Sequence, residues 1–129
     1  MQCTDQISKL ASLLIVEAAA KKRSLDYTQL LQMMGWASEY GSRRRTQMTA
    51  VLLPEIARLC HEKSLPVLSV LAVSSVTRKP EQWFEIFAKN RMGVLRDAND
   101  ERSWRLFVNQ QQKLAVAYWG VGRKWDISR

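Results

Sequence analysis

The chain has 129 residues, and its 20 Lys and Arg against 12 Asp and Glu give a formal net charge of +8. This length is typical of one domain, which we assign to residues 1–129. A hydrophobic share of 47% with five Gly and three Pro excludes the disordered and collagen-like classes. Two cysteines are too few for a disulfide framework, so we expect reduced thiols and a cytoplasmic protein.

The N-terminal stretch Thr4 to Arg23 is predicted to be a helix, because apolar residues recur on one face. That face consists of Ile7, Leu10, Ala11, Leu14 and Ala18. Glu17 interrupts the apolar run and Lys21-Lys22-Arg23 follows it, so we expect neither export nor a membrane span. Val16 and its apolar neighbours outside this face predict a second covered side, against the core or against the second subunit of a homodimer.

A short second helix is predicted from Tyr27 to Met34, with Gly35 placed for a left-handed C-terminal cap. The stretch from Trp36 to Arg45 contains Gly and several Arg, and we expect it to be a polar connection.

Apolar periodicity resumes at Met48 and continues to Cys60. Proline in a helix interior costs about 3 kcal/mol, so we place Pro54 in the first turns of a helix that runs to about Lys63. Residues 48–53 are then a separate turn or a kinked lead-in. The following run, Val67 to Val73, is rich in Val and Leu, which favours a strand buried on both faces.

Two helices are predicted in the C-terminal part. Pro80-Glu81 has the form of a helix N-terminus, and three aromatic residues then share one face: Trp83, Phe84 and Phe87. The second helix spans Asn99 to Trp119, closes at Gly120 and Gly122, and precedes the tail from Arg123 to Arg129.

These elements predict a predominantly helical α+β fold with a minimal β-sheet, a helix-turn-helix or winged-helix-like core and a long C-terminal helix. Within the domain, residues 1–26 form the N-terminal helix, 27–79 the winged-helix-like segment, and 80–129 the C-terminal helices with a basic, aromatic tail.

The order of short motifs between Tyr27 and Val73 carries a family resemblance. A Tyr-x-x-Leu helix ending in Gly35 leads through Arg43-Arg44-Arg45 into a helix, and then through Leu65-Pro66-Val67-Leu68 into a strand. This stretch, about a third of the chain, resembles the winged-helix domain of the alkyltransferase-like DNA-repair proteins. The resemblance implies a DNA-binding scaffold with a recognition helix.

The reactive cysteine of those repair enzymes has no counterpart here. Their Pro-Cys-His-Arg motif lies on the strand after the recognition helix, where this chain has Ser69-Val70-Leu71. Cys60-His61 lies in the preceding helix, without the flanking Pro and Arg. Alkyl transfer is therefore not expected, and only the scaffold carries over.

No catalytic, metal-binding or cofactor-binding site is predicted. His61 is the only histidine, and it points about 100° away from Cys60 on a helix, so we place Cys60 in the core and His61 on the surface. The carboxylate groups are typical of helix surfaces and first turns. They are Glu55 with Glu62, Glu81 with Glu85, and Asp97, Asp100 and Glu101.

The densest cationic cluster is Arg43-Arg44-Arg45, just before the predicted recognition helix. Guanidinium groups there could bind phosphates and set how the helix docks in a groove. Neutral donors from Ser42, Thr46, Gln47 and Thr49 could add contacts. Further candidate cations are Arg78, Lys79, Arg123, Lys124 and Arg129. The alternative is a solvated or acid-paired loop that aids solubility.

Trp36 and Trp125 lie outside the helical core spacing and beside basic residues. Such residues could stack on a base or enter a partner pocket, or they could pack over an edge of the core.

The leading hypothesis is a non-enzymatic DNA-binding regulatory or accessory protein, since a net positive field attracts nucleic acid. The second is a small interaction module, an inhibitor or adaptor that binds an acidic surface on a nucleic-acid-handling protein. Small basic proteins of phages and mobile elements would suit either function. A basic surface with no specific partner is the third hypothesis.

Overall fold

The computed structural model describes residues 3–21, 24–36, 41–94 and 100–126. Its helices are α1 (Cys3–Lys21), α2 (Tyr27–Met33), α3 (Gly41–Gln47), the π-helical segment η2 (Met48–Leu52), α4 (Leu53–Glu62), the 3-10 turn η3 (Leu68–Leu71), α5 (Gln82–Arg91) and α6 (Glu101–Trp119). The strands are β1 (Leu25–Asp26) and β2 (Ala72–Val73). The predicted class, predominantly helical α+β with a minimal sheet and a long C-terminal helix, is confirmed.

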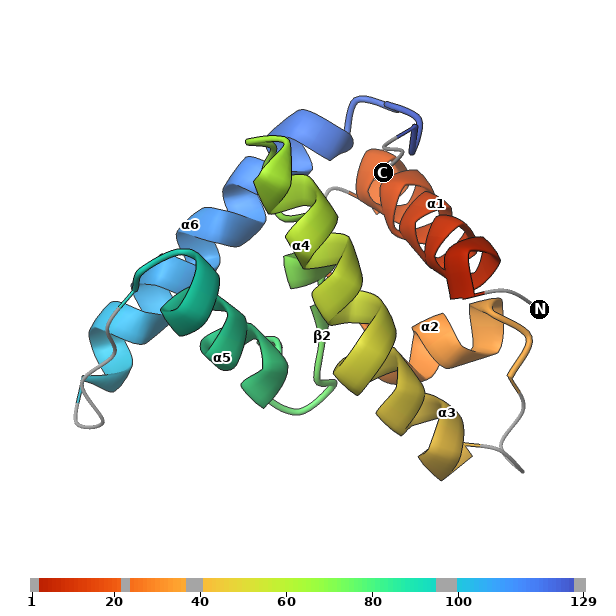
Figure 1. Cartoon of the computed structure of the whole chain (residues 1–129), viewed down its shortest axis with the longest axis horizontal. Coiled ribbons are helices and arrows are strands. Elements are labelled where there is room, and N and C mark those ends of the chain that lie inside the picture. Colours follow the sequence, from red (N-terminus) through yellow and green to blue (C-terminus); the bar gives the residue numbers. More distant parts are fainter. Residues whose placement is uncertain (1–2, 22–23, 37–40, 95–99, 127–129) are drawn as a thin grey trace.

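α3, η2 and α4 follow one another without a break and form a helical rod through the middle of the molecule (Figure 1). The predicted kinked lead-in to Pro54 is the π-helical segment, in which the Leu53 N–H donates to the Met48 carbonyl. Pro54 lies in the first turn of α4, as predicted. The wider π turn suits this position, because proline has no N–H to donate and its ring crowds the preceding turn.

The predicted polar connection from Trp36 to Arg45 is wrong at its C-terminal end, where Arg43, Arg44 and Arg45 lie on α3. Arg and Gln are good helix formers, and joining α3 to η2 supplies the length that a lone turn lacks. Residues 37–40 lie outside the described residues.

The predicted seven-residue strand from Val67 to Val73 is also wrong, although all of these residues are buried as expected. Most of the run is the η3 turn, and only Ala72–Val73 is a strand. That strand pairs in parallel with β1, Leu25 opposite Ala72 and Asp26 opposite Val73. Because β1 begins at Leu25, which lies opposite Ala72, it offers no partner for residues 68–71. The backbone groups of residues 68–71 instead form hydrogen bonds within the 3-10 turn.

The described residues contain no β-hairpin that could serve as a wing, since their sheet is this one parallel pair. The winged-helix resemblance therefore stays a prediction from the sequence motifs.

Caps and glycines fix the helix ends. The Asp26 carboxylate accepts from the Gln29 N–H at 2.8 Å in a capping box, and Gly35 takes the left-handed conformation at φ +79°. At the other end of the chain, a Cβ on Gly120 would lie 2.4 Å from the Val116 carbonyl oxygen and 3.2 Å from that of Ala18. Only glycine therefore fits where α6 ends against α1.

The core is built around η3, which lies between α1, α4 and α6. The inner face of α6 is fixed to this segment by two side chains. The Gln112 amide donates to the Val70 carbonyl at 3.3 Å, and the Trp119 indole donates to the Pro66 carbonyl at 2.9 Å. Nearer the N-terminal end of α6, an aromatic cluster joins this helix to α5. It contains Trp83, Phe84, Phe87, Trp104 and Phe107.

Tyr27 joins the N-terminal half of the core to α5. Its hydroxyl, on a residue only 1% exposed, accepts from the Glu81 N–H at 3.0 Å and from the Trp83 indole at 3.3 Å. The hydroxyl is protonated at neutral pH, and burial raises the pKa of Tyr27 further.

Tyr27→Phe leaves both donors without an acceptor, and we expect the free energy of unfolding to fall by about 1–3 kcal/mol. Urea denaturation measures this change, with an unaltered dependence on urea if the fold is kept. Tyr118→Phe is the matched control, because its half-buried ring keeps its contacts, and it should change stability by less than about 0.5 kcal/mol. Equal effects of the two substitutions would contradict the role of the Tyr27 hydroxyl.

Candidate nucleic-acid interface

The three arginines of α3 have different surroundings. Arg43 is exposed. The Arg44 guanidinium lies 4.9 Å from the centre of the Trp36 ring and donates to the Gln47 side chain at 2.9 Å. Arg45 pairs with Glu81 at 2.9 Å and lies 5.1 Å from the centre of the Tyr27 ring. Two of the three predicted phosphate ligands are therefore already engaged within the protein.

The neutral donors near this cluster are partly used as well. The Gln47 amide donates to the Gln6 side chain at 2.9 Å, which joins α3 to α1. The Thr49 hydroxyl donates back to the Arg45 carbonyl at 3.0 Å. Thr46 is exposed, and the Ser42 side chain lies outside the described residues.

Arg78 and Lys79 lie after β2, and both have intramolecular partners. Arg78 adopts a left-handed conformation, φ 57°, and its guanidinium donates to the Ser24 carbonyl at 3.1 Å and pairs with Asp26 at 3.8 Å. Lys79 pairs with Glu101 at 3.9 Å. Each of these ion pairs is long and has one exposed partner, so both are weak and a phosphate could displace them at little cost.

In the C-terminal tail, Arg123 lies 4.0 Å from the centre of the Tyr118 ring and donates to the Tyr118 carbonyl at 2.8 Å. Lys124 is exposed, and Arg129 lies outside the described residues. Trp125 is half-buried with its ring 5.9 Å from Trp119. Trp36 is half-buried against the core as well. Both tryptophans therefore pack over an edge of the core.

The exposed side of α4, the predicted recognition helix, carries more acid than base. Arg58 donates to Glu55 at 2.8 Å and to Glu62 at 2.6 Å, and these two carboxylates hold its pKa above the usual range. One arginine held between two glutamates leaves a local negative charge along Leu53–Glu62, and exposed Lys63 follows at the C-cap. Contact of α4 with DNA stays a prediction, and this charge works against it.

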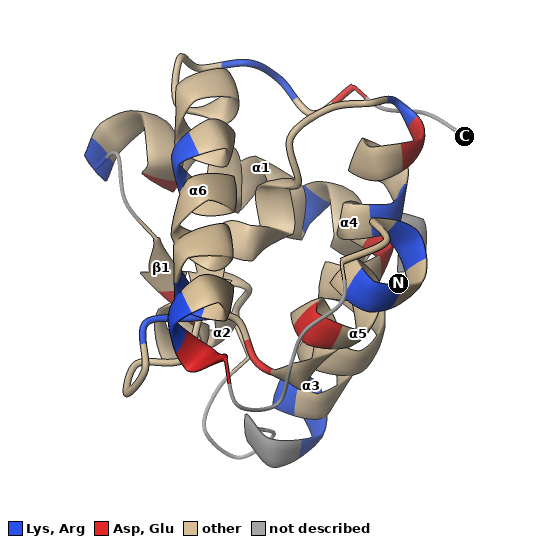
Figure 2. Ribbon diagram, turned by 90° about the vertical axis from the view of Figure 1, so that its left-hand side faces the viewer, with Lys and Arg blue, Asp and Glu red and all other residues tan. Residues whose placement is uncertain are grey.

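Some exposed cations have neither an ion pair nor a hydrogen bond with another described residue. Most of these cations lie outside the predicted DNA-binding residues. The whole set is Arg43, Lys63, Lys89, Arg91, Arg102, Arg105, Lys113 and Lys124. Three of them lie on α6, and Figure 2 shows Lys and Arg at intervals along that helix. The sequence prediction missed this face. Its signal was the helical spacing of 102, 105 and 113, which the aromatic residues of the opposite face hid.

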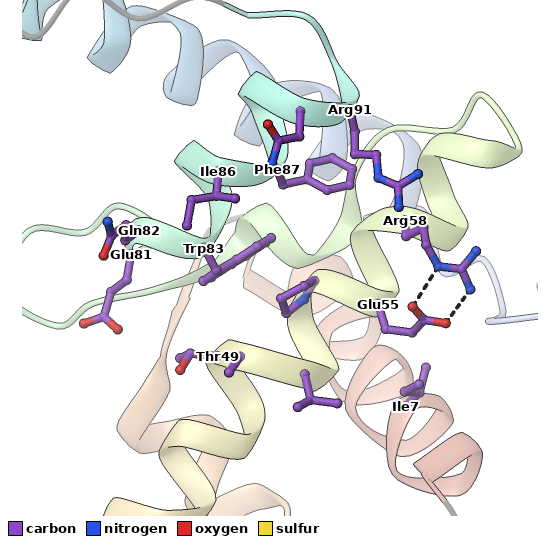
Figure 3. A pocket seen from close by; sticks show the side chains of 14 residues that line it. Ile7, Thr49, Glu55, Arg58, Glu81, Gln82, Trp83, Ile86, Phe87 and Arg91 are labelled. Carbon is purple, nitrogen blue, oxygen red and sulfur yellow. Dashed lines mark hydrogen bonds and ion pairs between the residues drawn. The ribbon is translucent and has the colours of Figure 1, made fainter.

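A groove of about 920 Å³ lies between the helical rod and α5 (Figure 3). Trp83, Ile86 and Phe87 line it from α5, and the rod contributes Thr49, Val51, Pro54, Glu55 and Arg58. Val51 and Ile86 are exposed by 47% and 52%, so the groove has an apolar, solvent-accessible floor. Its charged lining residues are Glu55, Arg58, Glu81 and Arg91, which balance one another.

Cys60 is buried and His61 is exposed, as predicted. Burial raises the pKa of the Cys60 thiol to about 11, which keeps it protonated and unreactive as a nucleophile. Within the described ranges no group of three His, Cys, Asp or Glu side chains could hold a metal ion. None of the described helices combines the length and apolar character that a membrane span requires.

No family model matches the chain, and no curated protein or solved structure matches it either.

Arg44→Ala combined with Arg45→Ala removes two cation–π contacts and one half-exposed ion pair. We expect the free energy of unfolding to fall by about 1–2 kcal/mol in urea denaturation. Arg43→Ala removes the same charge from an exposed side chain of the same helix, and its effect should stay below about 0.5 kcal/mol. If Arg43→Ala lowers the free energy of unfolding by half as much as the double variant or more, the distinction between these arginines is wrong.

The Cys60 thiol makes stability depend on alkaline pH. Its pKa rises from 9.0 to about 11 on folding, so between these values the unfolded chain loses a proton that the folded chain keeps. The stabilising effect is complete below pH 9.0 and is lost as the pH rises through about 11. Wild type should therefore lose stability more steeply than Cys60→Ala over this range, measured by urea denaturation at several pH values. Parallel pH profiles would contradict the shift.

Proposed function

We propose that this protein is a non-enzymatic DNA-binding regulatory or accessory protein that binds the phosphate backbone through exposed lysines and arginines. The observation that carries the proposal is the set of exposed cations with neither an ion pair nor a hydrogen bond to another described residue. Such groups attract phosphates without first breaking an internal contact, and each phosphate bound releases counterions from the duplex.

The contacts of the predicted Arg43–Arg45 cluster refine this proposal. Arg43 is available as a phosphate ligand, whereas Arg44 and Arg45 would have to leave Trp36 and Glu81. Arg78, Lys79 and Arg123 would add contacts only after giving up weak exposed ones. Lys124 is exposed and needs no such exchange.

The second candidate function is a protein-interaction module, and the groove between the rod and α5 favours it. Exposed Val51 and Ile86 beside Trp83 and Phe87 form a surface of the kind that receives an apolar side chain from a partner. In this proposal the acidic partner surface meets the free cations, and the groove supplies apolar contact.

A homodimer through α1 and a cytoplasmic location complete the proposal. Most apolar residues of α1 are buried within the chain, so a dimer there would rest on Val16, which is 60% exposed. The buried Cys60 thiol is suited to a reducing compartment.

Titration of the full chain against a random-sequence duplex DNA tests the proposed function. We expect binding at low salt, with the logarithm of the binding constant falling linearly as the logarithm of salt concentration rises, because bound phosphates release counterions. Fluorescence anisotropy of labelled DNA measures the slope. Ile86→Asp, a change in the groove, should leave it nearly unaltered.

Absence of binding at low salt would overturn the DNA proposal and leave the interaction module as the better candidate. A loss of DNA binding in Ile86→Asp with the fold intact would show that the groove, and not the free cations, contacts the DNA.

A further inference from the structure

The outer face of α6 is defined by residues that are all exposed and that recur with helical spacing. They are Arg102, Arg105, Leu106, Asn109, Gln110 and Lys113. The opposite face of the same helix is fixed to the core through Val108, Ala115 and Trp119, which are buried. A rigid inner attachment therefore holds the outer face in one orientation toward solvent.

The chemistry of this face matches that of a duplex base edge. Arginine pairs with the two acceptors of guanine, and Asn or Gln pairs with the donor and acceptor of adenine. Leu106 is 60% exposed, and apolar side chains contact the thymine methyl group. Lysine supplies a flexible cation for the phosphates.

The charge of α6 also suits this role. The helix carries Arg102, Arg105 and Lys113 against the single acid Glu101, which is at its N-terminal end. The three cations make no ion pair with any other described residue, so they can neutralise phosphates at once. α4 has the reverse balance, with Arg58 held by Glu55 and Glu62.

The dimensions agree as well. A helix with its side chains is about 10–12 Å across, and the major groove of B-form DNA is about 12 Å wide. The face from Arg102 to Lys113 extends about 16 Å at about 1.5 Å per residue. That length covers about five base pairs at about 3.4 Å each. In Figure 1 α6 lies along one side of the molecule, where the duplex could approach it.

We propose that the outer face of α6 is the recognition surface of this protein and lies in the major groove of duplex DNA. Asn109 and Gln110 contact base edges, with Leu106 beside them, while Arg102, Arg105 and Lys113 contact phosphates or guanine. This inference rests on the proposed DNA-binding function and replaces α4 by α6 as the recognition helix.

Two triple-alanine variants test whether DNA binds to this surface or to other exposed cations of the protein. The first changes Arg102, Arg105 and Lys113 to Ala, and the charge-matched control changes Lys63, Lys89 and Arg91 to Ala. All six side chains are exposed and lack an ion pair to another described residue. We expect the α6 variant to reduce the salt slope by about 0.9 for each phosphate that it no longer binds, and the control to reduce it far less. Circular dichroism and thermal unfolding check that both variants fold.

A third variant, Asn109→Ala with Gln110→Ala, keeps the charge unchanged. Sequences enriched by wild type from a random duplex library supply its DNA probe. We expect the variant to keep the wild-type salt slope but to lose about 5-fold or more of the preference for the enriched duplex over a scrambled one. Wild type should also protect guanine N7, which lies in the major groove, from methylation, and the α6 cation variant should not.

The outcomes distinguish the two levels of the proposal. If wild type binds no DNA, the proposed function fails and the recognition surface fails with it. If the control weakens binding as much as the α6 variant, DNA binding stands and the α6 surface is overturned. Absence of N7 protection, or of any sequence preference in wild type, overturns major-groove recognition. Tighter binding to an RNA duplex of the same sequence overturns the choice of DNA.

Discussion

The arrangement of the whole domain depends on burying the segment from Val67 to Val73. Every residue in it is buried, and α1, α4 and α6 cover it from different sides. A buried backbone must satisfy its own polar groups. Here the 3-10 turn does so over residues 68–71, the pairing with β1 does so at Ala72 and Val73, and side chains from α6 cap the Pro66 and Val70 carbonyls. Because α6 supplies those caps from one face, its other face is left to solvent.

The prediction of secondary structure succeeded where apolar residues recur with helical spacing over a long stretch. Long amphipathic stretches identify α1, α4 and α6, and Pro80 with the following aromatic residues identifies the start of α5. The run at 67–73 could not be settled in this way, because a short apolar run fits a buried strand and a buried turn equally well. What decided it was the length of its pairing partner. β1 begins at Leu25, opposite Ala72, so it cannot pair with the residues before Ala72, and this register joins segments that lie far apart in the sequence.

The candidate site shows the same division between local and distant information. The Arg43–Arg45 cluster is plain in the sequence, but the partners of two of its members are not. Arg45 meets Glu81, which lies 36 residues further along the chain, and Arg44 meets Trp36 across a connection whose path the sequence does not specify. The exposed face of α6 was open to prediction, since its residues recur every three to four positions. The aromatic residues of the inner face dominated that pattern, which indicated packing alone.

A cluster of basic residues in the sequence therefore need not be the cluster of unpaired cations on the folded surface. In this chain, folding places aromatic and acidic side chains close enough to engage the guanidinium groups of Arg44 and Arg45. On a helix the neighbours of a basic residue are those at i±3 and i±4, and an acid among them can pair with it. On α6 Leu106, Asn109 and Gln110 cannot neutralise a cation, and Glu101, four residues before Arg105, pairs with Lys79. Three of the eight exposed cations without an ion pair or hydrogen bond to another described residue thus lie on α6, where no run of basic residues marks them in the sequence. Free charge of this kind attracts anions.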